Sequence, residues 1–151
     1  MRPDAHKVLI YATWQDTLLV FDEPDFPEVE LQVPGGTMEP GESPEAAARR
    51  EFAEETGMTP PDKFVHLATQ DYHFVKSGRE ICHRRHYFHV ALAGEQRRGW
   101  LHCEMTPDSG GPPIRFRFFW LAMAEARGRL GYGMQEALEP LQVRGRLKSP
   151  I

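Results

Sequence analysis

The sequence has little of what marks secreted, membrane or nucleic-acid-binding proteins. Its two cysteines, Cys82 and Cys103, cannot form a disulfide framework and suit a reducing compartment. It has no apolar run near the ~18 residues of a membrane span, and its first residues lack the pattern of a signal peptide. A net charge of −4 gives no general basic surface. We therefore expect a cytoplasmic protein that binds neither membranes nor duplex nucleic acid.

The composition is otherwise that of a globular domain. The chain has 151 residues, of which 40% are hydrophobic and 26% charged, and a chain of this length can bury a core without covalent staples. We find no internal repeat and no boundary, so we predict a single domain over residues 1–151. The 18 lysines and arginines are enough to bind a small anionic substrate locally.

Residues 44–56 are predicted to form a helix. Ser43 is a suitable N-cap, Pro44 suits the first helical position, where no amide donor is needed, and Gly57 tolerates the left-handed conformation that ends many helices. The alanines at positions 46–48 favour the helical state.

Three acidic residues of this helix lie at positions where they destabilise it. Glu51, Glu54 and Glu55 fall within one narrow arc, and Glu51 and Glu55 repel each other at i,i+4 by about 0.2–0.5 kcal/mol. All three lie in the C-terminal half, where the helix dipole disfavours anions. Clustered carboxylates are natural ligands for hard cations, so the arrangement indicates a metal site, and a solvated acidic face is the alternative.

The residues around the helix follow a longer motif. Its seven fixed positions are Gly36, Glu42, Arg50, Glu51, Glu54, Glu55 and Gly57. A chance match is expected in about one of a billion windows at equal residue frequencies. Residues 36–58 resemble the complete Nudix box, with Phe52 bulkier than the aliphatic residue usual at its position. The order of predicted strands and helices also resembles that of the Nudix family.

The resemblance implies a fold and an activity. The expected fold is α/β, a Nudix-type α/β/α sandwich around a mixed β-sheet. The expected activity is a Mg²⁺-dependent pyrophosphohydrolase, with Mn²⁺ as a substitute. Its substrate would be a small-molecule nucleotide: a nucleoside triphosphate, ADP-ribose or a sugar nucleotide, or a dinucleoside polyphosphate. A non-catalytic nucleotide-binding sensor is the alternative. The oligomeric state stays open, with a homodimer as one option.

The resemblance also assigns roles by position. It implies that Glu51, Glu54 and Glu55 bind the metal together with the carbonyl of Gly36. It pairs Glu42 with Arg50 in an ion pair that orients these acids. Members of the family place the general base either in the box or in a downstream loop. Glu54 is therefore the first candidate for the base and Glu104 the second.

The rest of the chain predicts strands and two further helices. Two hairpins are expected, residues 7–14 with 17–21 and residues 64–75 with 80–92. Residues 29–33 alternate as a half-buried strand, residues 114–120 predict another strand, and residues 122–130 and 134–141 are moderately helical.

Residues 95–113 predict a long irregular segment, rich in glycine and proline. Such segments in compact domains are often functional, so we interpret this one as a lid, with disorder as the alternative. It carries Trp100, His102, Glu104 and Asp108, a suitable set for base stacking and proton transfer.

Substrate contacts are predicted outside the box. Arg84 and Arg85, in the run Cys-His-Arg-Arg-His at 82–86, suit phosphate, with a solvated strand end as the alternative. The spacing of this run matches no common zinc-ligand pattern. Trp100 is an aromatic candidate for stacking on a base.

Overall fold

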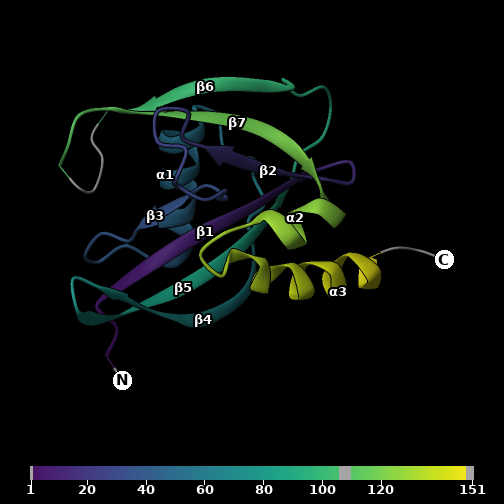
Figure 1. The fold of residues 1–151 in the computed structure, drawn as a ribbon. Helices are drawn as coiled ribbons and strands as arrows, with labels where there is room; N and C mark the ends of the chain where they lie inside the picture. Colours follow the sequence, from purple (N-terminus) through teal and green to yellow (C-terminus); the bar gives the residue numbers. More distant parts are fainter. Residues whose placement is uncertain (1, 106–109, 149–151) are drawn as a thin grey trace.

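The computed structural model describes residues 2–105 and 110–148, which form a mixed sheet between helices (Figure 1). The strands are β1 (Ala5–Trp14), β2 (Thr17–Asp22), β3 (Gly35–Thr37), β4 (Val65–Lys76), β5 (Arg79–Ala91), β6 (Gly99–Glu104) and β7 (Ile114–Ala122). The helices are α1 (Pro44–Thr56), α2 (Met123–Arg129) and α3 (Leu138–Lys148), with a 3₁₀ turn, η1 (Met134–Ala137). The predicted α/β class is confirmed.

The sheet has the order β4-β5-β1-β2-β7-β6, with β3 paired to β1. The β1–β5 ladder is parallel and the others are antiparallel. Helix α1 covers one face, and α2, η1 and α3 cover the other (Figure 1). None of the helices in the described ranges is long and apolar enough to cross a membrane.

The central strand β1 is buried on both faces because apolar side chains fill both sets of alternate positions. Val8 and Ile10 pack in the cluster that contains Phe52 of α1. Leu9 and Tyr11 pack in the opposite cluster, which contains residues of α2, η1 and α3. A strand buried on both faces reads as a continuous apolar run, as it does here.

Strand β1 changes its neighbour along its length. It pairs with β2 only at Thr13 and Trp14, next to the hairpin turn. Farther from the turn, Lys7 to Leu9 pair with β3 instead. The sheet therefore opens between β1 and β2, and β3 lies in the opening with its two glycines.

The predictions for α1 and both hairpins are confirmed. Helix α1 spans residues 44–56; the Ser43 hydroxyl accepts a hydrogen bond from the Ala46 amide at 3.2 Å, and Gly57 ends the helix at φ 76°. The predicted strand at 114–120 and the two C-terminal helical segments are also present.

The predicted strand at residues 29–33 is wrong. The segment makes only isolated bridges, Gln32 to Phe21 and Leu31 to Leu130. Leu31 and Val33 are nevertheless buried, as the alternation predicts. No continuous ladder forms, because each of the two neighbouring segments pairs with residues 29–33 at a single residue.

The prediction that residues 95–113 are irregular is wrong for their central part, whereas residues 95–98 and 110–113 lie outside helices and strands as predicted. Residues 99–104 form β6, which pairs with β7 along its whole length. The interpretation as a lid therefore fails for Trp100, His102 and Glu104, which lie on an ordered strand. Asp108 lies outside the described residues. Glycines and prolines around this strand concealed it in the sequence.

Candidate functional site

The backbone of β3 lies directly against the acids of α1. A Cβ atom added to Gly36 would come within 2.2 Å of the Glu51 carboxyl carbon, so a side chain at this position would collide with the carboxylate. The neighbouring Gly35 amide donates a hydrogen bond to Glu55 Oε1 at 3.1 Å. Two box acids are therefore held against a strand that only glycine allows to approach.

The three acids of the arc differ in exposure. Glu51 and Glu55 are buried, with 8% and 7% of their surface accessible, whereas 61% of the Glu54 side chain is accessible. Buried carboxylates are costly unless they have partners. Glu51 and Glu55 are thus fixed groups, and Glu54 is open to solvent.

Arg50 is the partner that several of these acids share. Its guanidinium donates to both oxygens of Glu42 at 2.8 and 2.9 Å, to Glu51 at 2.8 Å and to Glu54 at 3.2 Å. It also donates to the Thr37 carbonyl at 3.1 Å. The Glu42–Arg50 ion pair predicted from the sequence is present and is bidentate. Arg50 therefore links the loop after β3 to the acids of α1.

The ion pair changes the pKa of both partners. Hydrogen bonds from Arg50 and from the Glu39 amide lower the pKa of Glu42 from 4.5 to about 2. Hydrogen bonding to Glu42 raises the pKa of Arg50. Both groups are therefore charged at neutral pH.

Strand β6 contacts the C-terminal turn of α1. The Trp100 indole N–H donates to the Thr56 carbonyl at 2.9 Å, and His102 Nε2–H donates to the Glu54 carbonyl at 2.8 Å. The last carbonyls of a helix have no partner within it, so these two side chains satisfy them.

The indole ring of Trp100 already packs against other side chains. Phe118 stacks on it with ring centroids 5.2 Å apart, and the Arg97 guanidinium lies 4.6 Å from its centroid. The structure thus places the predicted base-stacking residue in packing contacts.

Two hollows border the acids. The larger, of about 730 Å³, is lined by Arg50, Glu51, Glu54, His102 and Glu104 among others. The smaller, of about 260 Å³, is lined by Gly36, Glu55 and Glu104, and also by Lys7, His83 and Arg85. Glu104 borders both hollows, opposite the box acids.

The predicted pair Arg84 and Arg85 is separated by β5, since successive side chains of a strand point to opposite faces. Arg85 is 5% exposed, donates to the Tyr132 carbonyl at 2.6 Å and lies 3.7 Å from the Tyr72 ring centroid. Arg84 instead binds Asp71 at 2.8 and 3.1 Å. Of the two, Arg85 borders the smaller hollow.

Sequence reasoning missed Lys7 and His83 as neighbours of the site. Lys7 lies opposite Thr37 in the β1–β3 ladder and donates to its hydroxyl at 2.5 Å. Only the register between strands distant in sequence brings Lys7 here, and no local motif signals that register.

The donors at this site fit a hard divalent cation. Three carboxylates lie on one side of α1, two of them buried, and the Gly36 backbone is in contact with one of them. Mg²⁺ takes oxygen ligands and keeps several waters, so a few carboxylates and a carbonyl meet its needs.

The layered fold and the box acids against β3 define an α/β domain of the Nudix type. A sequence profile described as NUDIX domain matches residues 1–139, and the chain belongs to the Nudix family. A search of curated proteins finds no match.

Similar solved structures share the fold at low identity. The NUDIX domain of Shewanella oneidensis NrtR in complex with ADP ribose has a TM-score of 0.65 and 17% identity, covering 98% of this chain and 91% of its own. The MutT protein of Bacillus halodurans has a TM-score of 0.63 and 19% identity, and the match covers 89% of this chain and 80% of the MutT chain. The C. elegans Ap4A hydrolase has a TM-score of 0.58 and 14% identity, and the match covers 92% of this chain and 96% of the hydrolase chain.

Proposed function

We propose that the protein is a pyrophosphohydrolase that uses Mg²⁺, or Mn²⁺ in its place, to cleave a diphosphate linkage in a nucleoside diphosphate derivative. One observation carries the proposal. The complete set of box acids is present, anchored by Arg50 and the β3 backbone, and borders two open hollows. A site with this much buried charge is costly to maintain without a use for it.

The residues of α1 have separate roles in this proposal. Glu51, Glu54, Glu55 and the Gly36 carbonyl would hold the cation, which supplies neutralisation of the diphosphate charge and activation of the attacking water. Glu51 and Glu55 are fixed by burial. The exposed carboxylate of Glu54 can accept a proton from that water, so it remains our first choice as general base.

Glu104 is the second choice for the base. It borders both hollows from β6, so it faces the substrate space without any loop closure. Arg50 and Glu42 do not need to touch substrate, because their bidentate pair orients Glu51 and Glu54.

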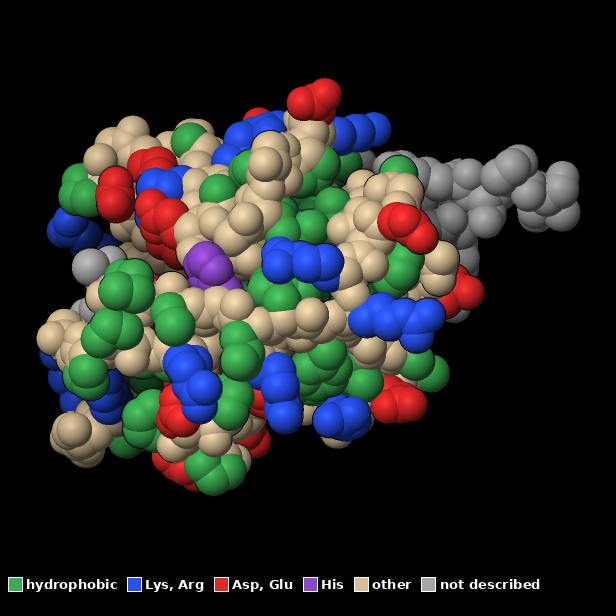
Figure 2. Space-filling view, turned by 90° about the horizontal axis from the view of Figure 1, so that it is seen from above, with side chains coloured by type: hydrophobic (Ala, Val, Ile, Leu, Met, Phe, Trp, Pro, Cys, Tyr) green, Lys and Arg blue, Asp and Glu red, His purple; other side chains and the backbone are tan. Residues whose placement is uncertain are grey.

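The substrate in this proposal is a small nucleotide. Lys7, His83 and Arg85 line the smaller hollow and favour an anionic group such as phosphate. Nucleoside triphosphates, ADP-ribose or sugar nucleotides, and dinucleoside polyphosphates all meet this description. On the face seen in Figure 2, basic, acidic and apolar side chains are intermingled, which supports a small ligand over duplex nucleic acid. Within the proposal, residues 1–151 act as one domain in the cytoplasm.

A non-catalytic nucleotide-binding sensor is the second candidate. The similar NrtR domain was solved with ADP ribose bound, so binding is a function to test for in this fold. The complete set of box acids favours hydrolysis, because a binding module has no need of a general base.

A panel of nucleotides tests the proposal. The protein is incubated with each nucleotide and Mg²⁺, and phosphate is measured after coupling to a phosphatase. We expect turnover of at least one nucleotide, abolished by excess chelator and restored by Mg²⁺ or Mn²⁺. Glu54→Gln is the matched inactive control. Binding of ADP-ribose by calorimetry, with no turnover on the whole panel, would establish the sensor instead.

A further inference from the structure

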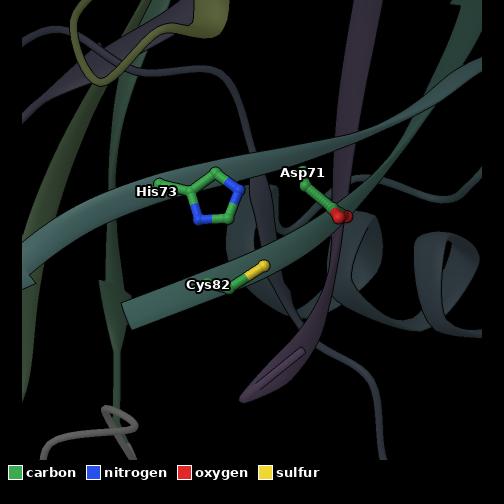
Figure 3. Close-up of side chains that lie close together, drawn as sticks. All are labelled: Asp71, His73 and Cys82. Atoms are coloured by element: carbon green, nitrogen blue, oxygen red, sulfur yellow. The ribbon is translucent and has the colours of Figure 1, made fainter. Parts of the chain in front are cut away.

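A second group of metal-ligating side chains lies on the β4–β5 hairpin, outside the box. Asp71 and His73 come from β4 and Cys82 from β5 (Figure 3). One ligand atom from each residue can be chosen so that all lie within 4.8 Å of one another. His73 and Cys82 are directly opposite in the ladder, and Asp71 is two residues before His73. The pleat therefore puts all three on one face of the hairpin.

We propose that Asp71, His73 and Cys82 form a binding site for Zn²⁺. Thiolate, imidazole and carboxylate are the ligands that zinc takes in proteins, at about 2.0–2.3 Å. Donor atoms around a tetrahedral zinc are then separated by about 3.3–3.8 Å, so donors that lie within 4.8 Å of one another need to move closer by no more than about 1.5 Å. The Cys82 sulfur points toward the space between the other two side chains (Figure 3). As the S–Zn bond forms, the thiol proton leaves to solvent. The fourth position is left for water.

The surroundings hold two of the ligands in place. Arg84 donates to both oxygens of Asp71, at 2.8 and 3.1 Å, and lowers the pKa of that carboxyl, which is therefore charged. Each carboxylate oxygen has a second lone pair for a metal, and hydrogen-bonded carboxylates are common zinc ligands. The Cys82 amide donates to Asp4 Oδ2 at 2.8 Å, and its carbonyl accepts from the Asp4 amide at 2.8 Å.

The exposure of the ligands suits a site at the protein surface. Cys82 is 3% exposed and Asp71 and His73 are exposed, so a cation would lie between the buried sulfur and solvent. Within the described residues, neither ring nitrogen of His73 makes a hydrogen bond, so either can turn toward a metal. The bound ion would connect β4, at the edge of the sheet, to β5.

Cobalt distinguishes this site from the box. Co²⁺ bound to a thiolate gives a near-ultraviolet charge-transfer band, and tetrahedral Co²⁺ absorbs strongly in the visible. The box acids offer only oxygen ligands, and Cys103, which also lines the larger hollow, is the one thiol of the chain that could give a thiolate band there. We expect the metal-stripped protein to develop the band with one Co²⁺ per chain and to lose it when Zn²⁺ is added.

Single substitutions show which residues give rise to the Co²⁺–thiolate band. Cys82→Ser should abolish it, whereas Cys103→Ser, at the other free cysteine, should keep it. His73→Gln changes an exposed ligand and should weaken Co²⁺ binding by at least about tenfold without unfolding the chain. Glu54→Gln should keep the band, so this result does not depend on hydrolysis.

Three outcomes would overturn the proposal. They are the absence of a thiolate band in the wild-type protein, a band that survives Cys82→Ser, and an unchanged Co²⁺ affinity in a folded His73→Gln protein. Failure of the nucleotide panel would leave all three measurements unaffected, so the two proposals can fail separately.

Discussion

Replacing Arg50 by alanine removes a guanidinium that contacts Glu42, Glu51 and Glu54. The side chains of Glu42 and Glu51 are only 14% and 10% exposed, so both carboxylates lose a partner while largely out of water. Removing one partner of a buried pair costs about 3–5 kcal/mol. The contact with the exposed Glu54 adds about 0–1 kcal/mol. Because Arg50 itself is 23% exposed, water relieves part of this loss, and we expect about 2–4 kcal/mol.

The same substitution should lower kcat by about 10–100-fold, because the acids lose the group that orients them. KM should change little, since Arg50 is not assigned a contact with substrate. The free energy of unfolding is measured in urea, and kcat and KM are measured at saturating Mg²⁺ on the substrate that the panel identifies.

Arg49→Ala is the matched control. Arg49 pairs with Glu45 and donates to the Pro61 carbonyl at 3.0 Å, away from the box acids. Its loss should reduce stability and leave kcat nearly unchanged. If Arg50→Ala raised KM alone and kept kcat, Arg50 would be a substrate contact and the argument from positioning would be refuted.

Acid unfolding gives an independent measure of the same pair. Because the pKa of Glu42 is depressed from 4.5 to about 2, the stability that the pair contributes is present above about pH 4.5 and is lost as pH falls to about 2. In Arg50→Ala the pKa of Glu42 should return toward 4.5. The variant should therefore lose stability less steeply than the wild-type protein between pH 5 and 2, and equal slopes would contradict this reasoning.

Further predictions concern the base and the backbone. Glu54→Gln should reduce kcat by about 10²–10⁴-fold, far more than Glu104→Gln, at saturating Mg²⁺. The opposite order, with metal affinity unchanged in both, would move the base to Glu104. Gly36→Ala should weaken Mg²⁺ activation, measured as the concentration that gives half-maximal rate, because its Cβ would collide with a carboxylate. Gly128→Ala, where a Cβ meets nothing within 4 Å, should leave that concentration unchanged.

The sequence predicted the parts of the fold whose signals are local. Helix α1 was placed to the residue because Ser43, Pro44 and Gly57 mark its ends through interactions within the helix. Both hairpins were recognisable because their turns and alternation lie close together in the chain. The Glu42–Arg50 pair was implied by the resemblance to the Nudix box, whose residues lie within one short stretch of the chain.

The parts that were missed depend on pairing between distant segments. Strand β6 exists because β7 pairs with it, and residues 29–33 fail as a strand because no neighbour pairs with them continuously. Lys7 reaches the site only through the β1–β3 register. The Asp71, His73 and Cys82 cluster draws its members from two strands, so no single window of sequence contains a zinc-ligand spacing.

The opening in the sheet has a mechanical consequence for the acids. β3 is paired to β1 and β6 belongs to the β2–β7–β6 half of the sheet, and α1 is bonded to both, through Glu55 to β3 and through its last carbonyls to β6. The helix therefore acts as a brace between two half-sheets. In the described residues, β1 and β2 pair directly at Thr13 and Trp14. The halves are also linked through the segment before β3, where Gln32 pairs with Phe21 and the Pro34 carbonyl accepts from the Ile10 amide. A substitution that widens the gap would strain the contacts of α1 with β3 or β6, and it would shift the acids relative to the β3 backbone rather than relative to one another, because all three lie on one helix.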